Sequence, residues 1–318
     1  MGRMHLNSSG WAARRVDAWL DTAWPRRLLA LLSLVGFAML AWNLTSPIVE
    51  HGTTGASDAR AYWAAGRRLL QGTALYADTA GQPFAFLYPP IAAQLVAPLS
   101  LLPLPVFAWG IRVLELLCLR YVVGSWKLAG ASMIVCLPVV AEIEAGNINL
   151  VIAAALAAAI RGDNRWLVPA AVPKFTALAA LPFALGRNRR ALVLGALGAA
   201  TLCALSVLSA PDLWRSYATF VISQPSVDNQ WYNVGRVVSL PARLLGAAVC
   251  ALIAIRRPVF MPVAVALSAP VLWFNSLSVL VAIVPAMTVD SATRASGHAL
   301  LGVDPALSDG RRPGRTVG

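Results

Sequence analysis

Apolar runs long enough to cross a membrane recur along most of this chain, and short arginine clusters separate several of them. A helix of about 20 apolar residues spans the hydrocarbon core of a bilayer, which is about 30 Å thick. Hydrophobic residues make up 58% of the 318 residues and charged residues only 13%, whereas a soluble domain usually carries about 25% charged residues. The chain is therefore predicted to be an all-α polytopic membrane protein rather than a soluble or disordered one.

The excess of basic residues fits the same interpretation. Lysine and arginine number 26 and aspartate and glutamate 14, which gives a net charge of +12. A nucleic-acid binder is also basic, but here the basic residues lie between apolar runs, as they do in the cytoplasmic loops of membrane proteins. We therefore predict a multi-pass protein of the cell membrane that contacts membrane lipids and has no nucleic-acid partner.

The apolar runs predict roughly ten transmembrane helices, which form a transmembrane domain at residues 25–289. Arginines precede the first run, so residues 1–24 are expected to be a cytoplasmic N-terminal segment. Residues 290–318 are rich in Gly, Ser, Asp and Arg and predict a disordered cytoplasmic tail. The runs lie at residues 25–44, 86–103, 106–124, 130–143, 147–160, 166–185, 191–209, 241–256, 258–273 and 276–289.

Two long polar intervals, at residues 45–84 and 211–240, interrupt the runs. If every run crosses the membrane once, both intervals lie on the outer side. The arginines at 187–190 then lie inside, as the charge rule requires, but the loop at 161–165 lies outside, against that rule.

Two neighbouring runs, 130–143 and 147–160, are short for a full crossing. The alternative is a broken or re-entrant pair that meets at residues 141–149. Irregular backbone at that depth is tolerated only where protein or a water-filled cavity surrounds it.

The first polar interval contains a segment with helical periodicity at residues 57–72. Ser57 suits a helix N-cap and Gly72 a helix stop. This segment predicts a helix that lies along the outer membrane surface with its apolar side toward the lipid. Its apolar residues recur on one face at helical spacing: Ala61, Tyr62, Ala65 and Leu69.

Asp58 is the first residue of that expected helix. Unpaired backbone N–H groups at a helix start favour an ionised carboxylate, and an ionised carboxylate can accept a proton from a hydroxyl group. The alternative is an ordinary helix-start residue, and the position taken alone favours that alternative.

A set of residues occurs in a characteristic order along the chain. In the first interval and the next run it consists of Asp58, Tyr62, Gly66, Leu70, Gly72, Tyr76, Tyr88-Pro89-Pro90, Pro98-Leu99-Ser100 and Pro103. Later members are Gly146-Asn147-Ile148-Asn149, Lys174 in its Val-Pro-Lys-Phe-Thr context, and the segment from Ser268 to Trp273. In this order, from about residue 45 to 288, the chain resembles glycosyltransferase family 87.

This resemblance implies a membrane enzyme of the GT-C class. Such an enzyme is an inverting hexosyltransferase that moves a sugar, here expected to be mannose, from a polyprenyl-phosphate donor to a lipid or glycan acceptor at the outer face. By carry-over at the matching position, Asp58 would be the general base. The chain departs from the family at Asn147, where members have Gln, and at Asn275, near which members often carry His.

The charged residues suggest how a phosphate would be held. The chain has no Asp-x-Asp pair of the kind that binds the metal of a nucleotide sugar, so we predict neither a metal site nor a cofactor. Lys174 is a candidate phosphate partner because an ionisable residue within a membrane run is by default a functional candidate. Snorkelling, or pairing with Glu142 or Glu144, is the alternative. Arg60 is a second candidate, with a lipid headgroup as its alternative contact.

Polar and aromatic residues near these groups are expected to line the substrate cavity: Tyr62, Tyr88, Asn147, Asn149 and Asn275. Two other classes of protein remain open at this point. A flippase or transporter of lipid-linked sugars predicts a polar path and pseudo-symmetric halves, whereas an inactive GT-C-like scaffold predicts a cavity that is blocked.

Overall fold

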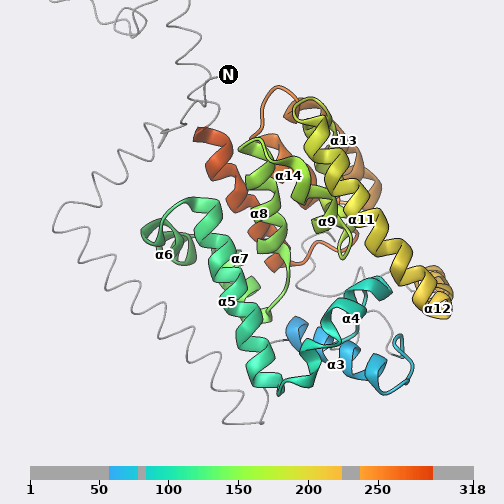
Figure 1. Ribbon diagram of the computed structural model, residues 1–318. Helices are drawn as coiled ribbons and strands as arrows, with labels where there is room; N and C mark the ends of the chain where they lie inside the picture. The colour runs from blue at the N-terminus through green and yellow to red at the C-terminus, as the bar shows by residue number, and fades with distance from the viewer. Residues whose placement is uncertain (1–56, 78–83, 224–236, 289–318) are drawn as a thin grey trace, which may run out of the picture.

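The computed structural model describes residues 57–77, 84–223 and 237–288 (Figure 1). Every regular element in these ranges is an α-helix or a 3-10 helix, which confirms the all-α class. The expected first span at 25–44, the N-terminal segment 1–24 and the tail 290–318 lie outside the described residues.

The first half of the described chain contains α3 (Ser57–Leu70), α4 (Pro90–Val96), η1 (Leu99–Leu101), α5 (Leu104–Val123), α6 (Trp126–Val135), α7 (Leu137–Ala145) and α8 (Asn149–Ile160). The second half contains η2 (Asn164–Trp166), α9 (Leu167–Ala171), η3 (Phe175–Ala180), α10 (Leu181–Leu185), α11 (Arg189–Ser209), α12 (Pro211–Ser223), α13 (Leu240–Ala254), α14 (Phe260–Leu267) and η5 (Phe274–Ala282).

Helix α8 lies at the centre of the bundle and is almost completely buried. It packs against α5, α9 and η5, and the largest apolar cluster of the structure surrounds it. Its side chains are mainly alanine, and small side chains let helices approach closely within a membrane. The sequence of α8 therefore suits a helix surrounded by other helices rather than by lipid.

The run at 166–185 does not cross the bundle. Prolines at 169, 173 and 182 interrupt it, and proline removes a backbone donor and clashes with the preceding turn of a helix. The run forms α9, η3 and α10, and α9 packs against η3. It is therefore a hairpin that enters the bundle and returns, with Lys174 at its inner turn, and the prediction of a single span here is wrong.

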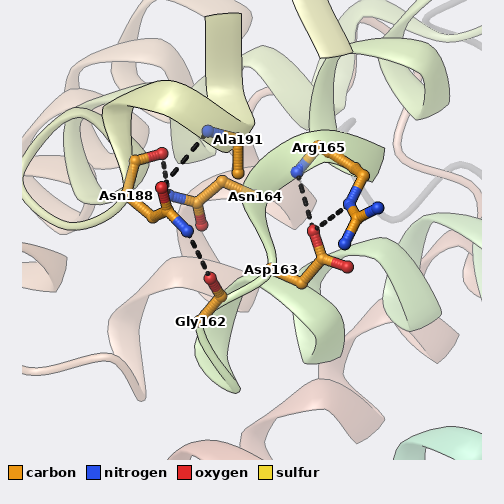
Figure 2. A network of polar contacts seen from close by, with 6 residues as sticks. All are labelled: Gly162, Asp163, Asn164, Arg165, Asn188 and Ala191. Carbon is orange, nitrogen blue, oxygen red and sulfur yellow. Dashed lines mark hydrogen bonds and ion pairs between the residues drawn. The ribbon is translucent and has the colours of Figure 1, made fainter. Parts of the chain in front are cut away.

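Hydrogen bonds close this hairpin at its base (Figure 2). The buried Asn164 side chain donates to the carbonyl oxygens of Ala184, at 3.0 Å, and of Asn188, at 3.3 Å. The Asn188 amide donates in turn to the Gly162 carbonyl at 3.2 Å. Its oxygen caps α11 by accepting from the Ala191 N–H group at 3.2 Å. The loops before and after the hairpin therefore lie at the same end of the bundle.

This arrangement removes the exception to the charge rule. The expected placement of loop 161–165 on the outer side is wrong, because that loop contacts the basic segment at 187–190. The end of α13 also lies here, since Ile255 is beside Gly186. One end of the bundle therefore collects exposed arginines, and the charge rule places that end in the cytoplasm. They are Arg161, Arg165, Arg187, Arg189, Arg190, Arg256 and Arg257.

The opposite end carries α3, α4 and α12, in the lower part of Figure 1. The ring of Tyr76, just after α3, stacks on Phe220 of α12 with a centroid distance of 4.9 Å. The described parts of the two long polar intervals are therefore neighbours, as the topology argument expected. Helix α3 differs from expectation in one respect. Its apolar face packs against α4, η1 and α5 rather than facing lipid.

The other runs give fewer long helices than the roughly ten that run length suggests. Run 86–103 forms only the short α4 and η1, and run 130–143 is bent by 99° between α6 and α7. Among the described residues, α11 alone is long and apolar enough to cross a membrane by itself, and the bent pair would be a second span. Helix α5 has 20 residues but includes three charged side chains.

The outward surface of α11 and α13 is apolar. Large side chains that are more than half exposed lie along both helices: Val193, Leu194, Leu197, Leu205, Leu208, Leu245 and Leu252. A contiguous exposed apolar surface of this kind is typical of contact with lipid or with another protein.

Cysteine labelling tests the hairpin. In a variant whose four cysteines are replaced, we expect Arg165→Cys and Arg190→Cys to react with an impermeant maleimide from the same side of sealed vesicles. Asp212→Cys, on exposed α12, is expected to react from the opposite side. Labelling of Arg165→Cys together with Asp212→Cys would restore a crossing at 166–185 and contradict the hairpin.

Candidate active site

A tight turn between α7 and α8 builds the centre of the candidate site. Gly146 ends α7 with a φ of +66°, in the left-handed region that favours glycine. A Cβ atom at this position would lie 2.8 Å from the Ala59 Cβ atom in the first turn of α3. Glycine therefore permits both the turn and the close contact with α3, and this contact brings Asn147 to Asp58.

Asp58, Asn147 and two tyrosines form the first polar cluster. The Asn147 amide nitrogen donates to Asp58 Oδ2 at 2.8 Å. The Asn147 amide oxygen accepts from Tyr62 Oη at 2.9 Å and from Tyr88 Oη at 3.2 Å. It also accepts from the Ile148 backbone N–H at 2.8 Å, which can only donate, so the orientation of the amide is fixed. The carboxylate of Asp58 is thus held by a side chain that is itself held at three points.

Asn275 contacts the same carboxylate oxygen from the other side of the bundle. Its amide nitrogen lies 3.5 Å from Asp58 Oδ2, and it comes from η5, 217 positions along the chain. Two amides from distant segments therefore face one oxygen of the Asp58 carboxylate.

Glu142, Asn149 and Lys174 form the second polar cluster. Both oxygens of the buried Glu142 carboxylate accept hydrogen bonds from Asn149, one from its backbone N–H and one from its side-chain amide at 2.8 Å. Because Asn149 is the first residue of α8, this carboxylate also faces the positive end of a helix dipole. The amide oxygen of Asn149 accepts from Lys174 Nζ at 2.7 Å. One asparagine therefore joins a carboxylate to the ammonium group.

The two clusters are electrostatically coupled. Partial burial raises the pKa of Asp58 above its ordinary value, and the nearby Lys174 ammonium group offsets part of that rise. The hydrogen bonds from Asn147 and Asn275 also favour the ionised form and lower the same pKa. The carboxylate is therefore a stronger base than an exposed aspartate and lies close to a cation.

An apolar groove of about 560 Å³ begins beside these clusters. Tyr62, Ile148 and Pro173 line it next to the site, since they carry or directly adjoin the groups just described. From there its lining follows α5, α8 and α9 to Tyr121, Ala158 and Trp166. Trp166 and Tyr121 are about half exposed, so the groove is open to the exterior here, where the Arg161 guanidinium lies 4.7 Å from the centroid of the Tyr121 ring.

The structure brings together seven of the eight site residues that the sequence suggested. They are Asp58, Tyr62, Tyr88, Asn147, Asn149, Lys174 and Asn275. Arg60 is the exception. Its guanidinium lies 4.4 Å from the centroid of the Phe84 ring, and no contact given for the described residues joins it to either cluster. Its expected contact with a phosphate therefore has no support in this arrangement.

Glu142 is the residue whose importance the sequence left open. Sequence reasoning named it only as an alternative partner for Lys174, beside Glu144. The structure places Glu142 in the Asn149 network, whereas the Glu144 backbone carbonyl accepts from Arg112 at 3.2 Å. The signal in the sequence was the spacing of Glu142, Gly146 and Asn149. A tight turn at Gly146 lets the Glu142 carboxylate reach the start of α8, seven positions later.

These features define a helical membrane enzyme with an acid–amide centre beside an apolar groove. A family model matches residues 86–294, and the chain belongs to glycosyltransferase family 87, a family of membrane enzymes. The matched range contains Asn147, Asn149, Lys174 and Asn275 but begins after α3, so it does not include Asp58. No curated protein and no solved structure matches the chain.

The second cluster predicts a coupled effect on stability. We expect Lys174→Met to lower the free energy of unfolding by about 2 kcal/mol, because it leaves the buried Glu142 carboxylate without its cation. The double variant Glu142→Gln/Lys174→Met is expected to recover at least about half of that loss. Thermal unfolding in detergent measures both, with Arg190→Met at the exposed start of α11 as the control. Additive losses in the double variant would contradict the coupling.

Proposed function

We propose that this chain transfers a sugar from a polyprenyl-phosphate donor to a hydroxyl group of a lipid or glycan acceptor at the outer face of the membrane. Mannose is the proposed sugar. The observation that carries the proposal is the position of Asp58, a carboxylate held between two amides and beside Lys174 at the inner end of an apolar groove. Membership in family 87 supports the class of reaction.

The groove suits the lipid part of the donor. Its lining is almost entirely apolar, and half-exposed side chains along it leave the groove open to the exterior of the bundle. An isoprenoid chain entering along α8 would bring its phosphate to Pro173 and Ile148, which adjoin Lys174 and Asn149. The open groove also argues against the blocked cavity expected of an inactive scaffold.

Lys174 would hold the phosphate. Its Nζ atom makes one hydrogen bond to Asn149, and an ammonium group has three donors, so further donors are available to phosphate oxygens. When the bond between the anomeric carbon and the phosphate oxygen breaks, the phosphate takes the electron pair. A cation at this position stabilises the developing negative charge. Asn149 and Glu142 are positioning residues that fix the direction of the lysine.

Asp58 would act on the acceptor. Its carboxylate takes the proton of the attacking hydroxyl as the new bond to the anomeric carbon forms, on the face opposite to the leaving phosphate. One base is enough for such an inverting displacement. Asn147 and Asn275 hold the carboxylate in place, and Tyr62 and Tyr88 hold Asn147.

Replacing the base tests the proposal directly. We expect Asp58→Asn to lower kcat for transfer from polyprenyl-phosphate mannose by about 100-fold to 10,000-fold, the usual contribution of a general base. Radiolabelled donor in proteoliposomes provides the assay. Asp163→Asn, the same change at the basic end of the bundle, is the matched control and is expected to retain activity. Full transfer by Asp58→Asn would remove the base assignment.

The pH profile gives an independent test. Transfer requires ionised Asp58, so kcat/KM is expected to fall as pH drops through the raised pKa of this group. Lys174 lowers that pKa, so Lys174→Met is expected to move the acidic limb of the residual activity to higher pH. If the parent chain and Lys174→Met are both active and show the same acidic limb, Lys174 does not lower the pKa of Asp58.

A further inference from the structure

A second cavity of about 620 Å³ lies between the turn at residues 72–77 and helix α12. It is separate from the apolar groove and has a different lining. Thr73, Ser216 and Thr219 contribute hydroxyl groups, Arg215 contributes a guanidinium group, and Tyr76 and Phe220 contribute aromatic rings. The mechanism described above uses none of these residues.

The aromatic side of this cavity is well ordered by its own contacts. Tyr76 stacks on Phe220 at 4.9 Å between centroids, and Tyr217 packs against Tyr76 at 5.5 Å. Aromatic surface combined with a few hydroxyl and cationic donors is the lining expected for a sugar, which presents C–H groups on its faces and hydroxyl groups on its edges. The mainly apolar groove, by contrast, offers a sugar few hydrogen-bonding partners.

A continuous aromatic wall links this cavity to the catalytic carboxylate. The Tyr76 hydroxyl donates to the backbone carbonyl of Tyr88 at 2.9 Å. Phe86 packs behind these two rings and is almost completely buried, with ring centroids 6.1 Å from Tyr76 and 5.6 Å from Tyr88. The partly exposed rings of Tyr76 and Tyr88 therefore form the accessible part of the wall. Tyr88 in turn donates to Asn147, which holds Asp58. A chain of sugar residues lying along this wall would have one end in the cavity and the other near the base.

We propose that this cavity binds the non-reacting residues of a saccharide acceptor, while the terminal residue presents its hydroxyl group to Asp58. The proposal rests on the glycosyltransferase function proposed above and specifies its acceptor: a saccharide of about three residues or more rather than a single sugar. The two cavities then serve the two substrates, the apolar groove the lipid donor and the polar cavity the glycan acceptor.

Variants on α12 test the proposal in the full-length chain. Ser216→Leu fills the cavity, and its control is Ala218→Leu, an exposed position of the same helix that does not line the cavity. Thr219→Val removes one hydroxyl group, and its control is Thr201→Val on α11. Both threonines are exposed and donate to a carbonyl one helical turn earlier, Thr219 to Arg215 and Thr201 to Leu197.

Two measurements distinguish this proposal from the function on which it rests. The first is equilibrium binding of fluorescently labelled mannotriose to the detergent-solubilised chain without donor. The second is the acceptor KM for octyl mannoside and for the octyl glycoside of mannotriose. Ser216→Leu is expected to weaken mannotriose binding, and to raise the ratio of trisaccharide KM to monosaccharide KM, about tenfold. Thr219→Val is expected to change each about threefold to fivefold, and both controls are expected to match the parent chain.

The outcomes separate cleanly. Transfer to octyl mannoside with no change of the KM ratio in either variant would overturn the acceptor cavity and leave the transferase function standing. Mannotriose binding that depends on Ser216 and Thr219, without transfer to any acceptor, would support the cavity and overturn the transferase function. Absence of mannotriose binding to the parent chain in an active preparation would overturn the cavity.

Discussion

The contact between Gly146 and Ala59 is the constraint on which the site depends. A side chain at 146 would collide with the first turn of α3, and the positive φ there reverses the chain between α7 and α8. The reversal puts Asn147 and Asn149 on two sides of Ile148. One amide reaches the carboxylate on α3, and the other reaches the glutamate at the end of α7 and the lysine of the hairpin. Residues 146–149 thereby join α3, the end of α7 and the hairpin that carries Lys174.

Charged groups in an apolar bundle persist only where other groups hold them, because desolvation otherwise favours their neutral forms. In this site the charged side chains are held by the amide groups of asparagines and not by direct contact with an opposite charge. Asn149 lies between Glu142 and Lys174, and Asn147 and Asn275 contact Asp58. Amides fix the direction of a carboxylate without neutralising it. Burial raises the pKa of the Asp58 carboxyl group, and the two amides offset part of that rise while they fix its orientation.

Residue type and local pattern predicted most of the residues that meet in the site, but they did not predict where the chain crosses the bundle and where it turns back. The helix that begins at Ser57 and the stop at Gly72 follow from local rules for helix ends and from the periodicity of the segment, and the structure confirms them. Run length failed at 166–185, because hydropathy treats a proline-interrupted run as continuous and cannot show that Asn164 and Asn188 meet.

The sequence also could not show which residues that are distant along the chain contact one another. Lys174 was recognisable as a charge in an apolar run, but its connection to Glu142 through Asn149 is a three-dimensional relation. Arg60 shows the converse. It adjoins Asp58 in the sequence region that the resemblance selects, yet the Phe84 ring, 24 positions later, takes its guanidinium. The contact of Arg60 with a phosphate stays a prediction, and its contact with Phe84 is one that the sequence did not indicate.

The hairpin has a mechanical consequence for the enzyme. Lys174 lies near the Asp58 carboxylate, but the segment that carries it is fastened at the arginine-rich end by Asn164 and Asn188. The lysine therefore lies at the tip of a segment that is anchored at the opposite end of the bundle. A displacement of the loops at the arginine-rich end would therefore be transmitted along the hairpin to the position of the Lys174 ammonium group.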